Sequence, residues 1–326
     1  MLVLLLMSGC AGIYSMVEFE VLEPATVSLP EEVNQLIVLN RAPLSMHSFE
    51  AKDVEGLEQK HLMILDTLIV KSIQRGLLTV FRESPIERFH FPYWVDVRRE
   101  DTTNLEAMLL TRREVEDICL ENGADAILSL ESYSMDYEGH VQTYVDSYLT
   151  ETAYFEISTI IKWIIYMPGN PRPFDHYTME DTLYFTEVLD GEILHRYTTA
   201  LMISESFEKS GRKYGKYLVP VWNRTSRNLY KGKEESLKKA SKQTNRGHWD
   251  QAYEIWEDLS ETEDNTTAAK ALYNMAIFHE LDDQLDSAGY LVNEALKRDT
   301  LDLIRTYKEE IDTRILNQRE LIKQVR

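Results

Sequence analysis

The feature that most constrains the fold is a recurring spacing of alanines in the last third of the chain. Ala276 is followed by Ala288 twelve residues later and by Ala295 after a further seven. An upstream copy places Ala240 and Ala252 twelve residues apart, and 36 residues separate Ala252 from Ala288. Alanine at such recurring positions lets antiparallel helices approach each other closely. The spacing therefore predicts a stack of paired helices.

These positions resemble the tetratricopeptide repeat, which has a period of about 34 residues. Asn274 also falls on a position of its consensus, and the expected packing positions of the two copies are Ala240, Gly247, Ala252, Ala276, Ala288 and Ala295. Because fewer than three repeats rarely stand alone, we expect a helix in residues 300–326 to cap the pair. The alternative is a plain pair of helical hairpins without repeat ancestry.

The resemblance also implies a protein or peptide partner, since tetratricopeptide arrays usually hold peptide segments on their concave side. The first helix of the better repeat carries the candidate partner-binding residues Lys270, Tyr273, Asn274 and His279. We therefore expect a non-enzymatic protein-binding or assembly module.

The body of the chain is predicted to be an α+β domain over residues 31–200, with a mixed sheet that includes an antiparallel meander. Leu36–Leu39 is a continuous apolar run of strand length, which is typical of a strand covered on both faces. Residues 53–78 have the apolar spacing of an amphipathic helix, and Gly76 is expected to weaken its end.

A second helix and a meander complete this body. Thr111 and Glu114 form a capping box at the start of the helix, and Gly123 supplies its stop. Residues 125–130 then read as a strand. From Thr152 the residues alternate, and one face carries the apolar side chains Phe155, Ile157, Ile161, Trp163, Ile165 and Met167. Turns then fold the chain back into antiparallel strands.

The amino terminus reads MLVLLLMSG before Cys10, an apolar run that ends in two small residues directly before a cysteine. The run is too short to span a bilayer, which needs about 20 residues. It resembles a bacterial lipoprotein signal, although no Lys or Arg precedes it, so the true start is expected to lie upstream. The resemblance implies that residues 1–9 are removed and that Cys10 is lipidated. The alternative is a buried strand with an ordinary core cysteine.

By the same resemblance, the residues after Cys10 point to the outer membrane, with the protein facing the periplasm and surface exposure left open. The membrane is then contacted through the lipid anchor alone. The expected order along the chain is a signal peptide in residues 1–9, a tether in 10–30, the α+β domain in 31–200, a helical connector in 201–232, two repeats in 233–299 and a capping helix in 300–326.

One further resemblance concerns part of the α+β domain, and another concerns nearly the whole chain. Ile37–Arg41 and Gly123–Glu131 are similar to the amino-terminal envelope domains of the CsgG and TolB types. The segments LPEEVNQLIVLNRA, LVPVWNRTSRNLY and HWDQAYEIWEDL, together with the lipobox, look like a family of Bacteroidetes lipoproteins with tetratricopeptide-like ends. Neither resemblance implies an activity, a substrate or catalytic residues.

Composition and motif content exclude several functions. The chain holds 35 basic and 55 acidic residues, and this net charge of −20 repels phosphate backbones, so we expect no nucleic-acid partner. Two cysteines cannot build a disulfide scaffold, and the eight histidines are dispersed, so we expect no metal and no cofactor. Nucleophile-elbow, phosphate-loop and dinucleotide signatures are absent from the sequence.

Two alternative functions stay open. One is carbohydrate binding within a polysaccharide uptake system, for which the candidate aromatics are Tyr144, Tyr148, Tyr154, Phe155, Trp163 and Tyr166. Alternation favours core positions for Phe155 and Trp163, so glycan binding requires other exposed, coplanar aromatics on the meander. The other is an envelope hydrolase, which requires a cleft with convergent His and carboxylate groups.

Overall fold

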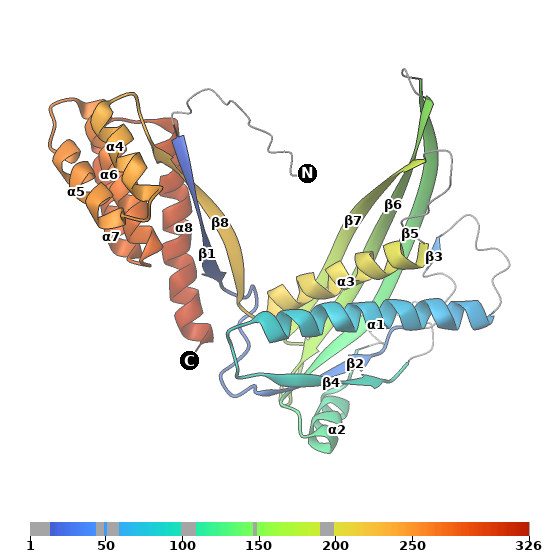
Figure 1. Ribbon diagram of the computed structural model, residues 1–326. Coiled ribbons are helices and arrows are strands. Elements are labelled where there is room, and N and C mark those ends of the chain that lie inside the picture. Colours follow the sequence, from blue (N-terminus) through green and yellow to red (C-terminus); the bar gives the residue numbers. More distant parts are fainter. Residues whose placement is uncertain are drawn as a thin grey trace. The chain divides into compact units, whose positions relative to one another are not determined.

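The computed structural model of the chain describes residues 14–43, 49–50, 59–98, 109–145, 149–189 and 199–325 (Figure 1). Cys10 lies outside these residues. The chain divides into two compact units. We call residues 25–221 the sheet unit, and residues 14–24 with 222–325 the helical unit. A mixed α/β unit and a carboxy-terminal all-α stack confirm the predicted fold class.

The sheet unit is built on one mixed sheet with the strand order β4-β2-β5-β6-β7, and β3 also pairs with β5. β2 runs parallel to β4 and β5, whereas β5, β6 and β7 form the predicted antiparallel meander. The strands are β2 (Gln35–Asn40), β3 (Phe49–Glu50), β4 (His90–Asp96), β5 (Ala126–Val145), β6 (Leu149–Tyr166) and β7 (Asp175–Leu189).

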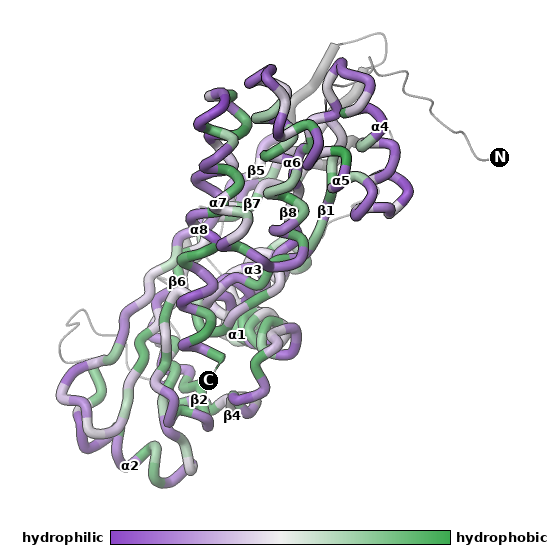
Figure 2. The backbone as a smooth tube through the Cα atoms, turned by 90° about the vertical axis from the view of Figure 1, so that its left-hand side faces the viewer, coloured by the Kyte–Doolittle hydropathy of each residue, from purple (hydrophilic) through white to green (hydrophobic). Residues whose placement is uncertain are grey.

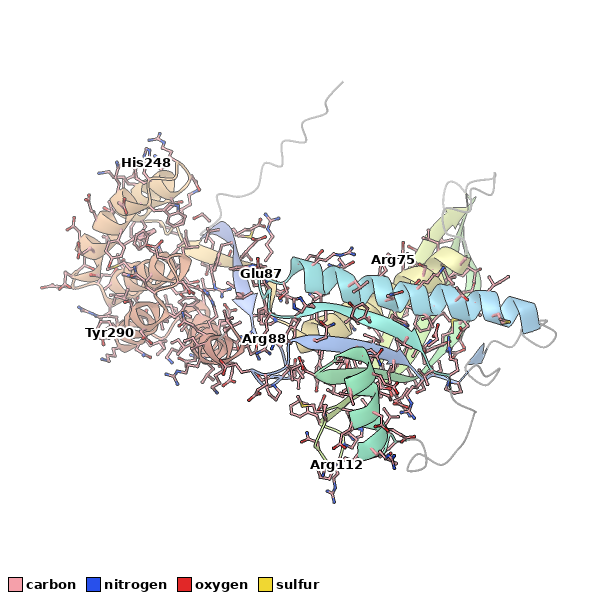
Figure 3. All side chains as sticks on the ribbon, turned by 90° about the horizontal axis from the view of Figure 1, so that it is seen from below. Arg75, Glu87, Arg88, Arg112, His248 and Tyr290 are labelled. Atoms are coloured by element: carbon pink, nitrogen blue, oxygen red, sulfur yellow. The ribbon has the colours of Figure 1, made fainter. Side chains whose placement is uncertain are left out.

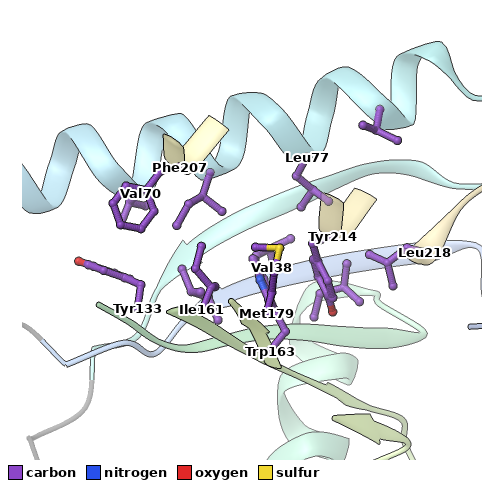
Figure 4. Close-up of a cluster of buried hydrophobic side chains, with 14 of the residues drawn as sticks. Val38, Val70, Leu77, Tyr133, Ile161, Trp163, Met179, Phe207, Tyr214 and Leu218 are labelled. Carbon is purple, nitrogen blue, oxygen red and sulfur yellow. The ribbon is translucent and has the colours of Figure 1, made fainter. Parts of the chain in front are cut away.

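Helices cover both faces of the parallel part of this sheet. α1 (Gln59–Glu83) and α3 (Thr199–Leu218) lie side by side on one face, and α2 (Arg112–Asn122) packs on the other (Figure 1). β2 therefore sends Val38 to the α1/α3 side and Ile37 to the α2 side, as its continuous apolar run predicts. Figure 4 shows the larger cluster, which includes Val38, Val70, Leu77, Tyr133, Ile161, Trp163, Met179, Phe207, Tyr214 and Leu218.

Gly76 has a different role from the predicted one. α1 continues through it to Glu83, so the expected weakening of the helix end is wrong. A Cβ atom at Gly76 would lie 2.0 Å from the backbone oxygen of Glu208 in α3, and one at Gly211 would lie 2.1 Å from that of Ile73. The two glycines thus allow α1 and α3 to touch backbone to backbone.

The second predicted helix is confirmed as α2, including its caps. The Thr111 backbone N–H donates to Glu114 Oε2 at 2.7 Å, and the Glu114 N–H donates to the Thr111 hydroxyl at 3.3 Å. The Thr111 hydroxyl also donates to Glu114 Oε2 at 2.7 Å, and the two bonds that this carboxylate accepts from the Thr111 backbone and hydroxyl lower the pKa of Glu114. Gly123 ends the helix with a φ of 59°, in the left-handed region. Cys119 is buried in α2, and burial raises the pKa of its thiol to about 11.

The helical unit contains five helices that alternate polar and apolar residues along each turn (Figure 2). They are α4 (Glu235–Thr244), α5 (Trp249–Ser260), α6 (Asn265–Leu281), α7 (Leu285–Arg298) and α8 (Asp302–Gln324). The five alanines of the recurring spacing are all fully buried between these helices. His248 and Tyr290, by contrast, project from the surface of the unit (Figure 3). Gly247, which the pattern grouped with the alanines, occupies the turn before α5 with a φ of 79°.

Two strands of the helical unit differ from the expected structure. β1 (Tyr14–Glu23) and β8 (Val221–Tyr230) pair as a two-stranded ribbon. Part of the expected tether is therefore a strand, and so is the end of the expected helical connector. α3, also assigned to that connector, packs on the sheet. The two strands lie about 200 residues apart in the chain, so no local pattern indicates their pairing.

Candidate functional site

The structure gives Asn274 and Tyr273, the predicted partner contacts, an internal role. Asn274 is fully buried on α6, where its Oδ1 accepts from the Tyr230 backbone N–H and its Nδ2 donates to the Tyr230 carbonyl, each at 2.8 Å. The Tyr273 hydroxyl donates to the Asn228 carbonyl at 2.7 Å. α6 therefore holds β8 by its backbone, as it would hold an extended peptide.

The other two candidates also have partners within the unit. Lys270 Nζ lies 3.6 Å from Glu234 Oε1, and most of its side chain is buried. His279 Nδ1 lies 2.6 Å from Gln284 Oε1, and its Nε2 lies 3.1 Å from the Tyr253 hydroxyl. All four residues thus lie on α6, and each contacts a neighbouring element of the same chain.

A buried ionic network also attaches the β8 strand of the ribbon to the helices. Glu280 on α6 is fully buried and accepts two hydrogen bonds of 2.9 Å from Arg227 of β8 and one of 2.8 Å from Arg314 of α8. Burial alone would lower the pKa of Arg227, but the bonds to Glu280 outweigh it and raise that pKa. No local sequence pattern indicates this network, because its members come from three distant segments of the chain.

A second polar cluster lies at the carboxyl ends of the parallel strands, where α/β sheets often bind ligands. Asp66 of α1 accepts from the Tyr133 hydroxyl and, at 2.6 Å, from Arg98. Asn40 Nδ2 donates to Asp96 Oδ1 at 2.6 Å. Burial raises the pKa of Asp66, and Arg98 offsets this only in part. These groups mainly pair with one another, so the cluster ties the strand ends together.

Apart from the end of β6 at Ile164 and Tyr166, which packs with α2, the meander presents one face that no described helix covers. Odd-numbered residues of β6 and β7, such as Ile157 and Met179, point into the core beneath α1 and α3. The even-numbered residues point the other way, and Ser158 is hydrogen-bonded to Thr182 across the two strands at 2.8 Å. We call this surface the open sheet face, and it comprises Asp136, Glu138, His140, Tyr154, Glu156, Ser158, Ile160, Lys162, Thr178, Glu180, Thr182, Tyr184 and Thr186.

The charge of the open sheet face is mostly negative. It carries four carboxylates and a single lysine among the described residues. Glu138 lies directly opposite Glu156 in the register of β5 and β6, with Tyr184 of β7 next in the same row. Like charges directly across a sheet are destabilising, so this arrangement costs stability in the isolated chain. A positively charged partner would offset that cost.

The same face carries exposed apolar and aromatic side chains. Tyr184 is 71% exposed and Ile160 is 39% exposed. The rings of His140 and Tyr154 stack with centroids 5.4 Å apart and planes 15° apart. Trp163 and Phe155 lie in the core, as the alternation predicted, and Tyr166 is also buried. The side chains of Tyr144 and Tyr148 are outside the described residues.

Two further observations bear on binding chemistry. Among the helices that the structure describes, none combines the length and the apolar composition that a membrane span requires. Within the same residues, no three His, Cys, Asp or Glu side chains form a group that could hold a metal ion.

The fold defines a two-unit protein in which a mixed α/β sheet unit accompanies an all-α stack. The chain belongs to the family described as "Domain of unknown function (DUF8603)", which matches residues 33–230. Residues 238–313 match a second family, described as "Domain of unknown function (DUF6340)".

No curated protein matches the chain. One solved structure, from Helicobacter pylori, is described as a neuraminyllactose-binding hemagglutinin homolog. It covers 72% of this chain and 94% of its own, with 11% sequence identity and a TM-score of 0.29.

Proposed function

We propose that the chain is a lipid-anchored outer-membrane protein of the Bacteroidetes lipoprotein type that binds a protein partner and catalyses no reaction. The lipobox before Cys10 supports the anchor. The partner surface is the open sheet face, because the four candidate residues on α6 already have partners within the helical unit.

The observation that carries this proposal is the excess of negative charge on the open sheet face among the described residues. Glu138 and Glu156 face each other across the strands, and Asp136 and Glu180 lie on the flanking positions of the same surface. Exposed Tyr184 and Ile160 stand among these carboxylates. Tyrosine is enriched among interaction hot spots, and complementary charges across an interface select the partner. The partner is therefore a protein with a basic surface.

Affinity capture of the lipidated protein from its own envelope tests this surface. We expect the combined substitution Glu138→Lys and Glu156→Lys to reduce recovery of the specific partner by about tenfold or more, because like charges across an interface cost several kcal/mol. The fold should tolerate the change, since it replaces one like-charge pair by another. Recovered proteins are quantified by mass spectrometry.

A matched control distinguishes an effect of the open sheet face from an effect of net charge. Glu205→Lys with Glu87→Lys makes the same change in charge at exposed positions of the sheet unit that are not on the open sheet face. We expect this variant to retain the partner. Equal recovery with both double variants, or equal loss, would show that the open sheet face does not bind it.

Carbohydrate binding is a second candidate, favoured by the stacked His140 and Tyr154 rings beside exposed Tyr184. Aromatic rings and neighbouring carboxylates together suit the apolar and hydroxyl groups of a sugar. In this case Tyr184→Ala should abolish binding to a panel of soluble oligosaccharides. Protein capture would then persist in the same variant.

A further inference from the structure

The distance between the proposed anchor and the first strand is short. Cys10 is separated from Tyr14, the first residue of β1, by three residues. Even a fully extended chain spans only about 14 Å over these four steps. If Cys10 carries acyl chains, the end of the helical unit at which β1 begins must lie close to the bilayer.

The exposed side of β1 changes in character along the strand. Tyr14 is 46% exposed and Met16 is 63% exposed, whereas the next two exposed positions on this side are Glu18 and Glu20. Glu18 lies about 13 Å further along the strand than Tyr14. Tyrosine and methionine suit the interfacial region of a bilayer, and carboxylates avoid anionic headgroups. Along β1, the exposed apolar residues are thus nearest the anchor and the exposed acidic residues are further away.

Neighbouring residues mark the two ends of the helical unit. The Tyr14 ring contacts that of Tyr230, with centroids 5.3 Å apart, and exposed Lys233 follows three residues later. Phe19, further along β1, lies beside Arg314 in the second half of α8. β1 therefore runs along α8, whose 23 residues extend about 34 Å, and the carboxyl end of α8 lies far from the start of β1 (Figure 1).

We infer that the end of the helical unit carrying Tyr14 and Met16 lies on the lipid surface, with α8 directed away from it. This inference rests on the lipid anchor of the proposed function. The anchor keeps the helical unit close to the bilayer, and the exposed side chains of Tyr14 and Met16 determine which end of the unit faces the headgroups.

Fluorescence quenching in vesicles tests this orientation. The lipidated full chain is placed in phosphatidylethanolamine and phosphatidylglycerol vesicles that contain brominated lipid, with one label at Lys233→Cys or at Val325→Cys. Both positions are exposed. Native Cys119 stays unlabelled at neutral pH, since it is buried and its pKa is raised to about 11. We expect several-fold stronger quenching at position 233 than at position 325.

Two matched variants extend the test. Met16→Glu should weaken the quenching at position 233, whereas Leu316→Glu, an equally exposed change on α8, should leave it unaltered. Equal quenching at both labels in acylated, vesicle-bound protein would overturn the inference and leave the anchor intact. Unacylated Cys10 and loss of vesicle binding would instead contradict the proposed function, and the inference with it.

Discussion

Gly211→Ala is expected to lower the free energy of unfolding of the sheet unit by about 3 kcal/mol, the upper end of the usual cost of overpacking. The added Cβ would lie 2.1 Å from the Ile73 backbone oxygen and 2.9 Å from its carbonyl carbon. Because these are backbone atoms, no side-chain rotation relieves the clash, and α1 and α3 must separate. Urea denaturation of the full chain measures the effect.

The direction of the change in the free energy of unfolding shows whether the two helices are in close contact. In an unobstructed helix, replacing glycine by alanine stabilises by about 1 kcal/mol. Lys216→Ala, at an exposed position of α3, is the control and should change stability by less than about 0.5 kcal/mol. A stabilised Gly211→Ala variant would contradict the close contact of the two helices.

Glu280→Ala is expected to destabilise the helical unit by about 3–5 kcal/mol, the usual cost of removing one partner from a buried ion pair. Arg227 and Arg314 both donate to this carboxylate, and Arg227, which is buried, would lose both of its bonds to Glu280. We also expect β8 to be released from α6. Thermal unfolding gives the stability, and limited proteolysis reports the release.

An exposed glutamate provides the comparison for this variant. Glu309→Ala, on an exposed position of α8, should leave the unfolding midpoint unchanged. If Glu280→Ala has no greater effect than Glu309→Ala, the network does not hold the ribbon on the helices.

Local signals explain which parts of the fold could be predicted. The start and end of α2 depend on Thr111, Glu114 and Gly123, which lie within thirteen residues of one another. The alternation along β6 correctly separates buried Trp163 from outward-facing Glu156. Both features depend on contacts within a single element or between an element and its cap, so the sequence contains them directly.

Long-range pairing explains which features of the fold could not be predicted from the sequence. The β1–β8 ribbon, the role of Asn274 and the network around Glu280 all depend on segments distant in the chain. The repeat spacing marks Asn274 as a consensus position, but its hydrogen-bond partner, Tyr230, lies on β8, 44 residues away in the chain. The like-charge pair of Glu138 and Glu156 likewise requires the register of two long strands. A single sequence does not indicate that register.

The proposed envelope location and the proposed orientation of the helical unit both depend on a lipid anchor on Cys10. Mass spectrometry of the amino-terminal peptide from protein purified from its native envelope tests it most directly. We predict a peptide that begins at Cys10 and carries acyl chains. A peptide in which Met7 is still joined through to an unmodified Cys10 would contradict the account.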